Sequence, residues 1–338
     1  MTHRFPIKEI AAQAGLSTAT VDRAINARPN VSAQTKARVK AALNELERQE
    51  GQLAARGRRL FVDIVVEAPR RFSQKVRRAA EAILPNFRPA VIRPRFTFQE
   101  VMSEDETLAH LSRIAQRGSH GVCLKARDLP RIRAAVAMLV AKGIPVVTMF
   151  TDLTAPDRLA YVGLDNAQAG RTAAYLMGVG LRGQSGTILL TQSQDAFEGE
   201  EARERAFRAA ISKHLPQMRL IEMSGGAGLA TPTATQIGAL TSQLHTLRGV
   251  YSMGGGNRAI LTALQGINCA PQLYIGHDLD AENRALLRSG HIHFLLDHDL
   301  GRDMARAFGT ITAYHRLNPI PIEPELADVQ ILTPAHMA

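Results

Sequence analysis

The sequence predicts an α/β protein: an N-terminal all-α helix-turn-helix headpiece, followed by a two-lobed core of doubly wound parallel sheets. The headpiece is predicted because apolar residues before residue 48 recur at helical spacing and a Gly-x-Ser turn interrupts them. The core is predicted because short apolar runs alternate with amphipathic segments from Leu60 onward. We expect a headpiece at residues 1–48, a hinge linker at 49–60 and a core at 61–338.

The first two predicted helices form the helix-turn-helix. An apolar stripe at Ile7, Ile10, Ala11 and Ala14 defines the first helix, which Gly15 ends. Ser17 supplies a hydroxyl N-cap for a second helix over residues 18–26. The residues that this second helix turns outward, as a recognition helix does toward base edges, are Thr18, Ala19, Asp22, Arg23 and Asn26.

A third helix fits residues 33–48, with Ser32 as its N-cap. Its apolar face is formed by Val39, Ala42, Leu43 and Leu46. Three short helices of this kind can enclose a small core, although the pattern alone does not require DNA binding.

The positive charge of the chain is concentrated in the headpiece. Residues 1–60 contain 11 Lys and Arg against 5 Asp and Glu, whereas the remaining residues contain 30 against 26. Lysine and arginine neutralise phosphates and release counterions, which attracts a protein to DNA whatever the sequence. The charge therefore favours a nucleic-acid partner for the headpiece.

The headpiece resembles that of the LacI family of bacterial transcriptional regulators. The matching runs are Ile7-Lys8-Glu9-Ile10-Ala11, Ala14-Gly15-Leu16-Ser17, Thr20-Val21 with Arg23 and Asn26, and Val31-Ser32-Ala33-Gln34-Thr35-Lys36-Ala37-Arg38-Val39. The resemblance implies sequence-specific binding to double-stranded DNA.

Arg23 is the main candidate for base recognition, because a guanidinium can donate two hydrogen bonds to guanine. Ala19 offers a methyl group that suits thymine. The other residues that we expect at the DNA are Lys8, Ser17, Thr18, Asn26, Asn30, Ser32, Thr35 and Arg56. Of these, Asn26, Asn30, Ser32 and Thr35 match family positions that mostly touch phosphate or the groove edge.

The predicted hinge departs from the family pattern. Relatives place a leucine in the minor groove as a wedge, whereas Gly57 stands at that position here. Arg56, Arg58 and Arg59 suit a narrow, electronegative minor groove without intercalation. The hinge therefore predicts less DNA bending than in a leucine-wedge relative and a steeper dependence on low salt.

The core is predicted to contain ten strands in two groups. The strands are expected at residues 61–66, 90–94, 121–124, 145–150, 159–163, 186–191, 219–223, 249–252, 272–276 and 293–296. Between them we expect helices at residues 74–84, 105–117, 131–142, 167–177, 200–214, 233–247, 258–264, 280–289 and 300–316.

The core also resembles that of the LacI family and, through it, the periplasmic sugar-binding proteins. The matching motifs are Val162-Gly163-Leu164-Asp165-Asn166 with Ala169-Gly170, Ile275-Gly276-His277-Asp278, and Asp297-His298-Asp299. The resemblance implies a small effector bound between the lobes, at the carboxyl ends of the strands.

Seven residues are candidates for binding this effector. They are Phe72, Asp152, Glu201, Arg203, Asn257, Asp278 and Asp297. Carboxylates such as Asp278 and Asp297 can accept hydrogen bonds from hydroxyl groups, and Phe72 can lie under the apolar face of a sugar. An alternative is that Asp278 only caps the following helix. Glu201 stands where relatives carry an arginine, with Arg203 two residues further on.

Other motifs do not indicate catalysis. The Gly-x-Gly-x-x-Gly run at 178–183 follows a helix, the reverse of the order in a dinucleotide fold. Residues 254–257 could cradle a phosphate, and the His and Asp residues between 291 and 299 could bind a metal, but neither spacing demands it. Cys123 and Cys269 suggest neither zinc nor a disulfide framework. We expect no cofactor and no metal.

These features predict a DNA-binding transcriptional regulator, expected to be a repressor, whose operator affinity a sugar or polyol controls. The alternative is a cytoplasmic sugar-processing enzyme or a stand-alone sugar-binding protein, neither of which needs the headpiece. We expect a homodimer on a palindromic operator, since one recognition helix covers only a few base pairs. No apolar run approaches the ~20 residues of a membrane span, so we expect the protein in the cytoplasm.

Overall fold

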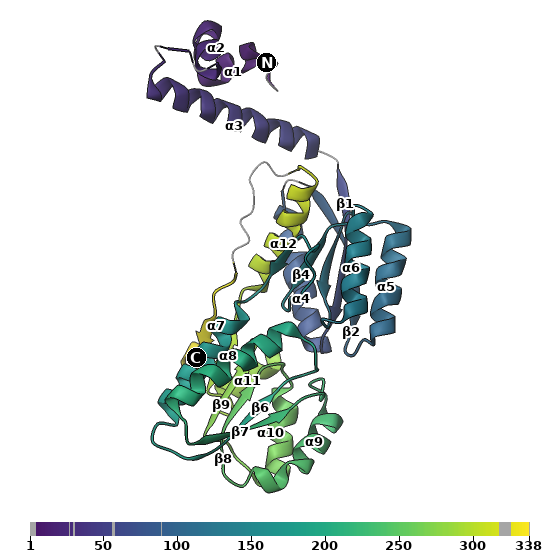
Figure 1. Ribbon diagram of the computed structural model, residues 1–338, viewed down its shortest axis with the longest axis vertical. Coiled ribbons are helices and arrows are strands. Elements are labelled where there is room, and N and C mark those ends of the chain that lie inside the picture. Colours follow the sequence, from purple (N-terminus) through teal and green to yellow (C-terminus); the bar gives the residue numbers. More distant parts are fainter. Residues whose placement is uncertain are drawn as a thin grey trace.

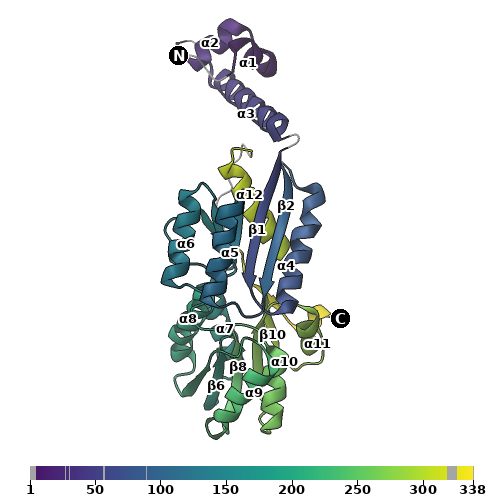
Figure 2. The ribbon, with the colours of Figure 1, turned by 90° about the vertical axis from the view of Figure 1, so that its right-hand side faces the viewer.

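The computed structural model shows an elongated molecule with a helical headpiece at one end and two α/β lobes stacked below it (Figures 1 and 2). The structure describes residues 5–26, 28–29, 31–55, 58–88, 90–317 and 326–337, with residues 48–55 and 86 described by their backbone alone. The predictions made for Asn30, Arg56 and Gly57 therefore lie outside the described residues.

The headpiece contains the three predicted helices, α1 (Ile7–Ala14), α2 (Thr18–Ile25) and α3 (Ala33–Ala55). Gly15 ends α1 in the left-handed region, with φ +61°. Both predicted caps are confirmed: Ser17 Oγ accepts a hydrogen bond from Thr20 N at 3.2 Å, and Ser32 Oγ accepts one from Thr35 N at 3.1 Å. The buried core of this unit is formed by Phe5, Ile10, Ala11, Ala14, Val21, Val39 and Ala42.

Helix α3 ends at Ala55, seven residues later than the predicted end at residue 48. Gly51 lowers helix stability by only about 1 kcal/mol, and most of the residues around it favour a helix. Much of the segment predicted as a hinge linker is therefore helical in this structure.

The first lobe is built on a five-stranded parallel sheet in the order β2-β1-β3-β4-β5. Its strands are β1 (Arg59–Glu67), β2 (Val91–Gln99), β3 (Gly121–Lys125), β4 (Val146–Met149) and β5 (Ala160–Val162). Its helices are α4 (Arg70–Ile83), α5 (Glu104–Arg117), α6 (Pro130–Ala141) and α12 (Leu300–Tyr314), with a 3-10 turn at Leu84–Asn86. Helices α4 and α12 cover one face of the sheet and α5 and α6 the other, each over its own apolar cluster (Figure 1).

The second lobe is built on a six-stranded sheet in the order β11-β10-β9-β8-β6-β7, in which only the β10–β11 pair is antiparallel. Its strands are β6 (Gly186–Thr191), β7 (Met218–Met223), β8 (Leu247–Ser252), β9 (Leu273–His277), β10 (Phe294–Asp297) and β11 (Gln330–Leu332). Its α-helices are α7 (Asn166–Gly180), α8 (Glu198–His214), α9 (Ala230–Ala239), α10 (Asn257–Gly266) and α11 (Ala281–Arg288). Short 3-10 turns lie at Thr241–Gln243 and Pro334–Met337.

All ten predicted core strands are present, so the predicted fold class is confirmed. The helix predicted at 233–247 was too long, because α9 ends at Ala239 and β8 begins at Leu247. Strand β11 was not predicted. Within the described part of the chain, no helix is long and apolar enough to cross a membrane.

The Gly-x-Gly run lies at the end of α7 and serves close packing. A Cβ at Gly178 would lie 2.9 Å from His214, and one at Gly180 would lie 2.8 Å from Leu273. These glycines let α7 approach α8 and β9, which accounts for the motif without a nucleotide.

Candidate functional site

The outward face of α2 is free to meet a ligand. Thr18, Ala19 and Arg23 are exposed, whereas Val21 on the opposite face is fully buried. The Arg23 side chain has neither a hydrogen-bond nor an ion-pair partner among the described residues. Of the other predicted DNA-binding residues that the structure describes, Lys8, Ser17, Asn26 and Ser32 are exposed and Thr35 is half-buried.

The Asn26 side chain is hydrogen bonded to Asp22, four residues earlier in the chain. Its amide Nδ2 donates to Asp22 Oδ1 at 2.8 Å and to Asp22 O at 3.0 Å. The free group is then the amide oxygen, which accepts hydrogen bonds and cannot bind a phosphate oxygen directly. Of the two contacts that the resemblance implied for Asn26, this arrangement suits the groove edge, where a base offers an amino group, better than a phosphate.

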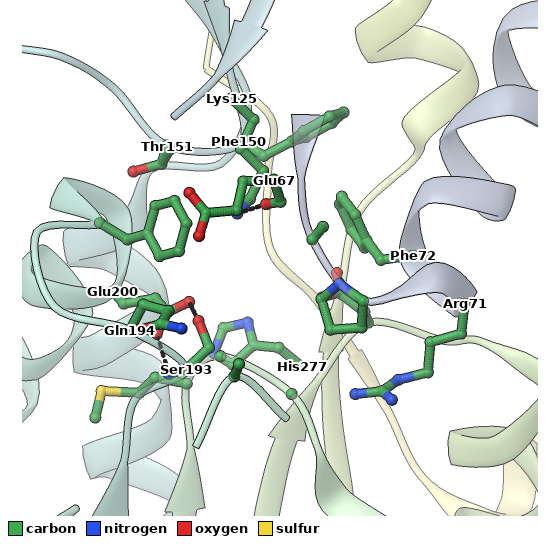
Figure 3. Close-up of a pocket in the computed structure, with 18 of the residues that line it drawn as sticks. Glu67, Arg71, Phe72, Lys125, Phe150, Thr151, Ser193, Gln194, Glu200 and His277 are labelled. Atoms are coloured by element: carbon green, nitrogen blue, oxygen red, sulfur yellow. Dashed lines mark hydrogen bonds between the residues drawn. The ribbon is translucent and has the colours of Figure 1, made fainter. Parts of the chain in front are cut away.

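A pocket lies between the two lobes at the carboxyl ends of their strands (Figure 3), which is where an open parallel sheet binds ligands. The first lobe contributes Glu67, Ala68, Pro69, Arg71, Phe72, Glu100, Lys125, Phe150 and Thr151. The second contributes Ser193, Gln194, Phe197, Glu200, Arg203, Ala227, Met253, Gly254, Gly255, His277, Asp278, Asp280 and Asn283, and His298 follows β10.

Glu67 and Lys125 form the polar centre of the first-lobe wall. Lys125 Nζ donates to the backbone oxygen of Glu67 at 2.7 Å and lies 3.7 Å from the centre of the Phe197 ring. Burial lowers the pKa of Lys125, opposed by the nearby Glu200 and Glu67 carboxylates. Glu67 is only 2% exposed, and its side chain points into the cavity (Figure 3).

Glu200 is fixed from the second lobe. Its carboxylate accepts hydrogen bonds from Ser193 N at 2.7 Å and from Ser193 Oγ at 2.6 Å. Burial raises the pKa of Glu200, and Lys125 and these two donors act in the opposite direction. A Cβ at Gly254 would overlap this carboxylate, so glycine is required there.

Three buried polar atoms of pocket residues have no hydrogen-bond partner among the described residues: Glu67 Oε1, His277 Nδ1 and His298 Nδ1. His298 Nδ1 lies 2.6 Å from the Asp303 carboxylate, which leaves Glu67 Oε1 and His277 Nδ1 without an ion-pair partner as well. His277 is fully buried, and its Nε2 lies 3.1 Å from the Tyr251 hydroxyl. Burial, then the charge of Arg203, sets the pKa of His277 well below its usual range, so the imidazole is neutral at pH 7. Buried polar atoms are normally satisfied, and these two therefore indicate a polar ligand.

Aromatic side chains form the apolar part of the wall. Phe72 and Phe150 pack edge to face with their centroids 5.1 Å apart, and Phe197 faces them from the other lobe. Phe150 and Asp278 both have φ +66°, a strained conformation for residues other than glycine. Aromatic plates beside a few fixed polar groups are typical of a small-molecule site.

Three of the seven predicted effector-binding residues line the pocket: Phe72, Arg203 and Asp278. Arg203 is nearly buried and donates to Asn166 Oδ1 at 2.8 Å and to the Met253 carbonyl at 2.5 Å. The capping alternative for Asp278 is wrong. The N-cap of α11 is Asp280, whose side chain accepts from Asn283 N at 2.7 Å.

The other four predicted residues do not line the pocket, because each is bound elsewhere. Asp152 accepts from Thr148 and Arg158, and Glu201 accepts from the backbone of Ala196. Asn257 is buried between Asn283 and Tyr274, at 2.9 and 3.0 Å, and Asp297 pairs with Lys75 at 2.9 Å.

The sequence analysis missed Glu67, Lys125, Glu200 and His277. Glu67, Lys125 and His277 each directly follow a predicted apolar strand, and that position was the available signal. Glu200 was missed by one residue, since Glu201 was chosen and successive helical residues point about 100° apart.

The lobes are also tied together beside the pocket. Arg71 and Lys75, one turn apart on α4, pair with Asp280 at 3.2 Å and Asp297 at 2.9 Å in the second lobe. On the other side, Gly199 N donates to Thr151 Oγ1 at 2.8 Å. The structure thus has its lobes closed on the pocket.

The described residues contain no group of three or more His, Cys, Asp or Glu that could hold a metal ion. Two of the histidines that suggested one have other partners. His293 Nδ1 accepts from Tyr274 N at 3.0 Å, and His291 Nδ1 lies 2.7 Å from Ser289 Oγ.

A helix-turn-helix headpiece joined to a two-lobed core with a pocket between the lobes defines a DNA-binding protein with a ligand-binding core. Residues 6–47 match the family of bacterial regulatory proteins called the lacI family, and residues 72–311 match the periplasmic binding protein domain. The chain belongs to the lacI family of bacterial regulatory proteins, with a core of the periplasmic-binding-protein type. Both matched families are defined by regulation or binding, and neither by catalysis.

Solved structures share the core fold. A glucose-galactose binding protein from Geobacillus stearothermophilus has a TM-score of 0.71 at 16% identity, covering 82% of this chain and 98% of that one. A putative LacI transcriptional regulator from Bacteroides fragilis has a TM-score of 0.69 at 17% identity, covering 82% and 97%. At these identities the likeness shows the fold alone. No curated protein sequence matches the chain significantly.

Proposed function

We propose that this protein is a transcriptional repressor in the cytoplasm, whose affinity for operator DNA is controlled by a neutral sugar or polyol. The observation that carries the proposal is the presence, in one chain, of an exposed recognition face on α2 and a pocket with two buried, unpartnered polar atoms. Such atoms can exchange hydrogen bonds with hydroxyl groups, and Phe72 and Phe150 offer apolar faces to a sugar ring.

A neutral effector is favoured over an anion because the cationic side chains of the pocket already have polar partners. Arg71 pairs with Asp280, Lys125 donates to the backbone oxygen of Glu67, and Arg203 donates to neutral oxygens. Proteins with the same core fold include the glucose-galactose binding protein and one solved with D-arabinose. These relatives support a sugar as the first class of compound to test.

The function is tested by two measurements on the wild-type protein. It should retard DNA from upstream of its own gene at moderate salt, and one member of a panel of sugars, polyols and sugar phosphates should raise its melting temperature and change that retardation. Failure to bind this DNA specifically, together with turnover of a sugar, would show the alternative enzyme instead.

Arg23→Ala should reduce discrimination at one base pair by about 1 to 3 kcal/mol and leave nonspecific binding largely intact, because a bidentate contact to guanine carries sequence information. The measurement is a comparison of affinities for operators that differ at single base pairs. An unchanged preference at every position would refute the role of Arg23.

We also propose that the protein binds a palindromic operator as a homodimer, through an interface between the cores. One α2 helix has only eight residues and covers a few base pairs, so two copies are needed for specificity. Light scattering at micromolar concentration should give twice the chain mass of 36.8 kDa. A monomer both in free solution and on operator DNA would contradict this assembly.

A further inference from the structure

Four exposed arginines gather at the end of the first lobe where the chain enters it. Arg58 and Arg59 stand at the start of β1, Arg93 lies on β2 opposite Phe61, and Arg316 follows α12. We call these four residues the arginine rim. None of the four has an ion-pair partner among the described residues.

The end of α12, which Arg316 follows, is fastened to β1 through His120. His315 Nε2 donates to the backbone oxygen of His120 at 2.6 Å, and His120 Nδ1 accepts from Phe61 N at 3.0 Å. Arg316 therefore lies close to the strand pair that carries Arg93.

Positive charge also lies directly behind the rim. The carboxylate of Asp63, which is 2% exposed, holds Arg117 at 2.5 Å and Arg95 at 3.7 Å, and Arg95 stacks on Phe61 at 4.3 Å from the ring centre. One carboxylate thus pairs with two guanidinium groups, which leaves a positive charge at this position. The described residues at this end include two exposed acids, Glu81 and Asp157, and Glu81 is paired with Arg77.

Helix dipoles do not account for this pattern. Cations are favoured at the carboxyl ends of helices, which explains Arg316 after α12. Arg59 and Arg93 lie on strands, where there is no helix end to compensate. The rim therefore favours an anionic partner outside the protein.

We propose that the arginine rim contacts the phosphate backbone of the operator duplex that the headpiece holds, an inference that rests on the proposed function. Helix α3 ends at Ala55 and β1 begins at Arg59, so the connecting residues span at most about 14 Å. The rim is at the end of the core nearest the headpiece (Figure 1). The short connection keeps the headpiece close to the rim, so the core offers a second DNA-binding surface in addition to the recognition face of α2.

The test compares wild type with the double variant Arg93→Gln/Arg316→Gln, which leaves the headpiece and Arg58 and Arg59 intact. The DNA is a duplex carrying the strongest site that wild type selects from a random-sequence pool. Wild type loses affinity between about 50 and about 200 mM salt, and each phosphate contact contributes about 3.5-fold to that loss. Each chain of the proposed homodimer loses two contacts, so the double variant should show a loss smaller by about 150-fold, with unchanged base preference.

The matched control is Arg182→Gln/Lys213→Gln, which removes the same charge from two exposed residues at the far end of the second lobe. Its salt dependence should equal that of wild type. If the rim variant and wild type have equal salt slopes, the rim proposal is wrong and the proposed function stands. If the two double variants change the salt dependence equally, the change reflects total charge, and the rim proposal is again wrong while the proposed function stands. If wild type selects no site, both proposals fall.

Discussion

Gly254→Ala is expected to abolish ligand binding in the pocket and to lower the free energy of unfolding by about 1 to 3 kcal/mol. A Cβ at this position would overlap Oε2 of Glu200 and lie 2.5 Å from the backbone nitrogen of Ser193. These two atoms are hydrogen bonded to each other at 2.7 Å. The Glu200 carboxylate would have to leave its donors while still buried, which costs more than the bond itself contributes.

The control for this substitution is Gly238→Ala. Gly238 lies in α9, and a Cβ there would meet no atom within 4 Å. Alanine should stabilise that helix by about 0.5 to 1 kcal/mol and leave ligand binding unchanged. Thermal denaturation with and without the stabilising sugar measures both variants. A Gly254→Ala protein that melts and binds like wild type would show that Glu200 and Ser193 can separate at little cost.

The fold could be predicted because each element follows from a local pattern. The ten core strands are apolar runs between turn residues, and Ser17 and Ser32 each stand one residue before a helix that they cap. Strand β11 is the exception, since its residues are exposed or half-buried and it is formed by pairing with β10. Such a strand has no apolar pattern of its own.

The pocket could be predicted only in part. Strand ends indicated the region, but they did not show which polar side chains have free atoms. Asp297 is taken by Lys75, 222 residues earlier, and Asn257 by Asn283 and Tyr274. The sequence around Asp297 or Asn257 does not reveal these partners. They are brought together by the packing of one lobe against the other, or of neighbouring elements within a lobe.

Glu67 is an acidic residue that the structure places in the effector pocket, whereas Glu201 is the one that the sequence predicted to bind the effector. Glu67 lines the cavity, and its Oε1 is buried and has no hydrogen-bond partner among the described residues, while Oε2 lies 3.4 Å from Arg127 Nε. Glu201 is half-exposed, accepts from Ala196 N at 3.1 Å and lies 3.6 Å from Arg205. A ligand hydroxyl can therefore satisfy Glu67 and gains nothing from Glu201.

Glu67→Gln is expected to weaken binding of the effector by about 10- to 150-fold, since a hydrogen bond to a charged group contributes about 1.5 to 3 kcal/mol. The amide keeps the volume of the carboxylate but loses its charge, so the fold should be retained. Glu201→Gln should bind the effector like wild type. The measurement is titration of each variant with the sugar that most stabilises the wild-type protein, followed by thermal denaturation and by release from operator DNA. If Glu201→Gln loses the response and Glu67→Gln keeps it, the effector binds outside the pocket between the lobes, and the position predicted from the sequence is the correct one.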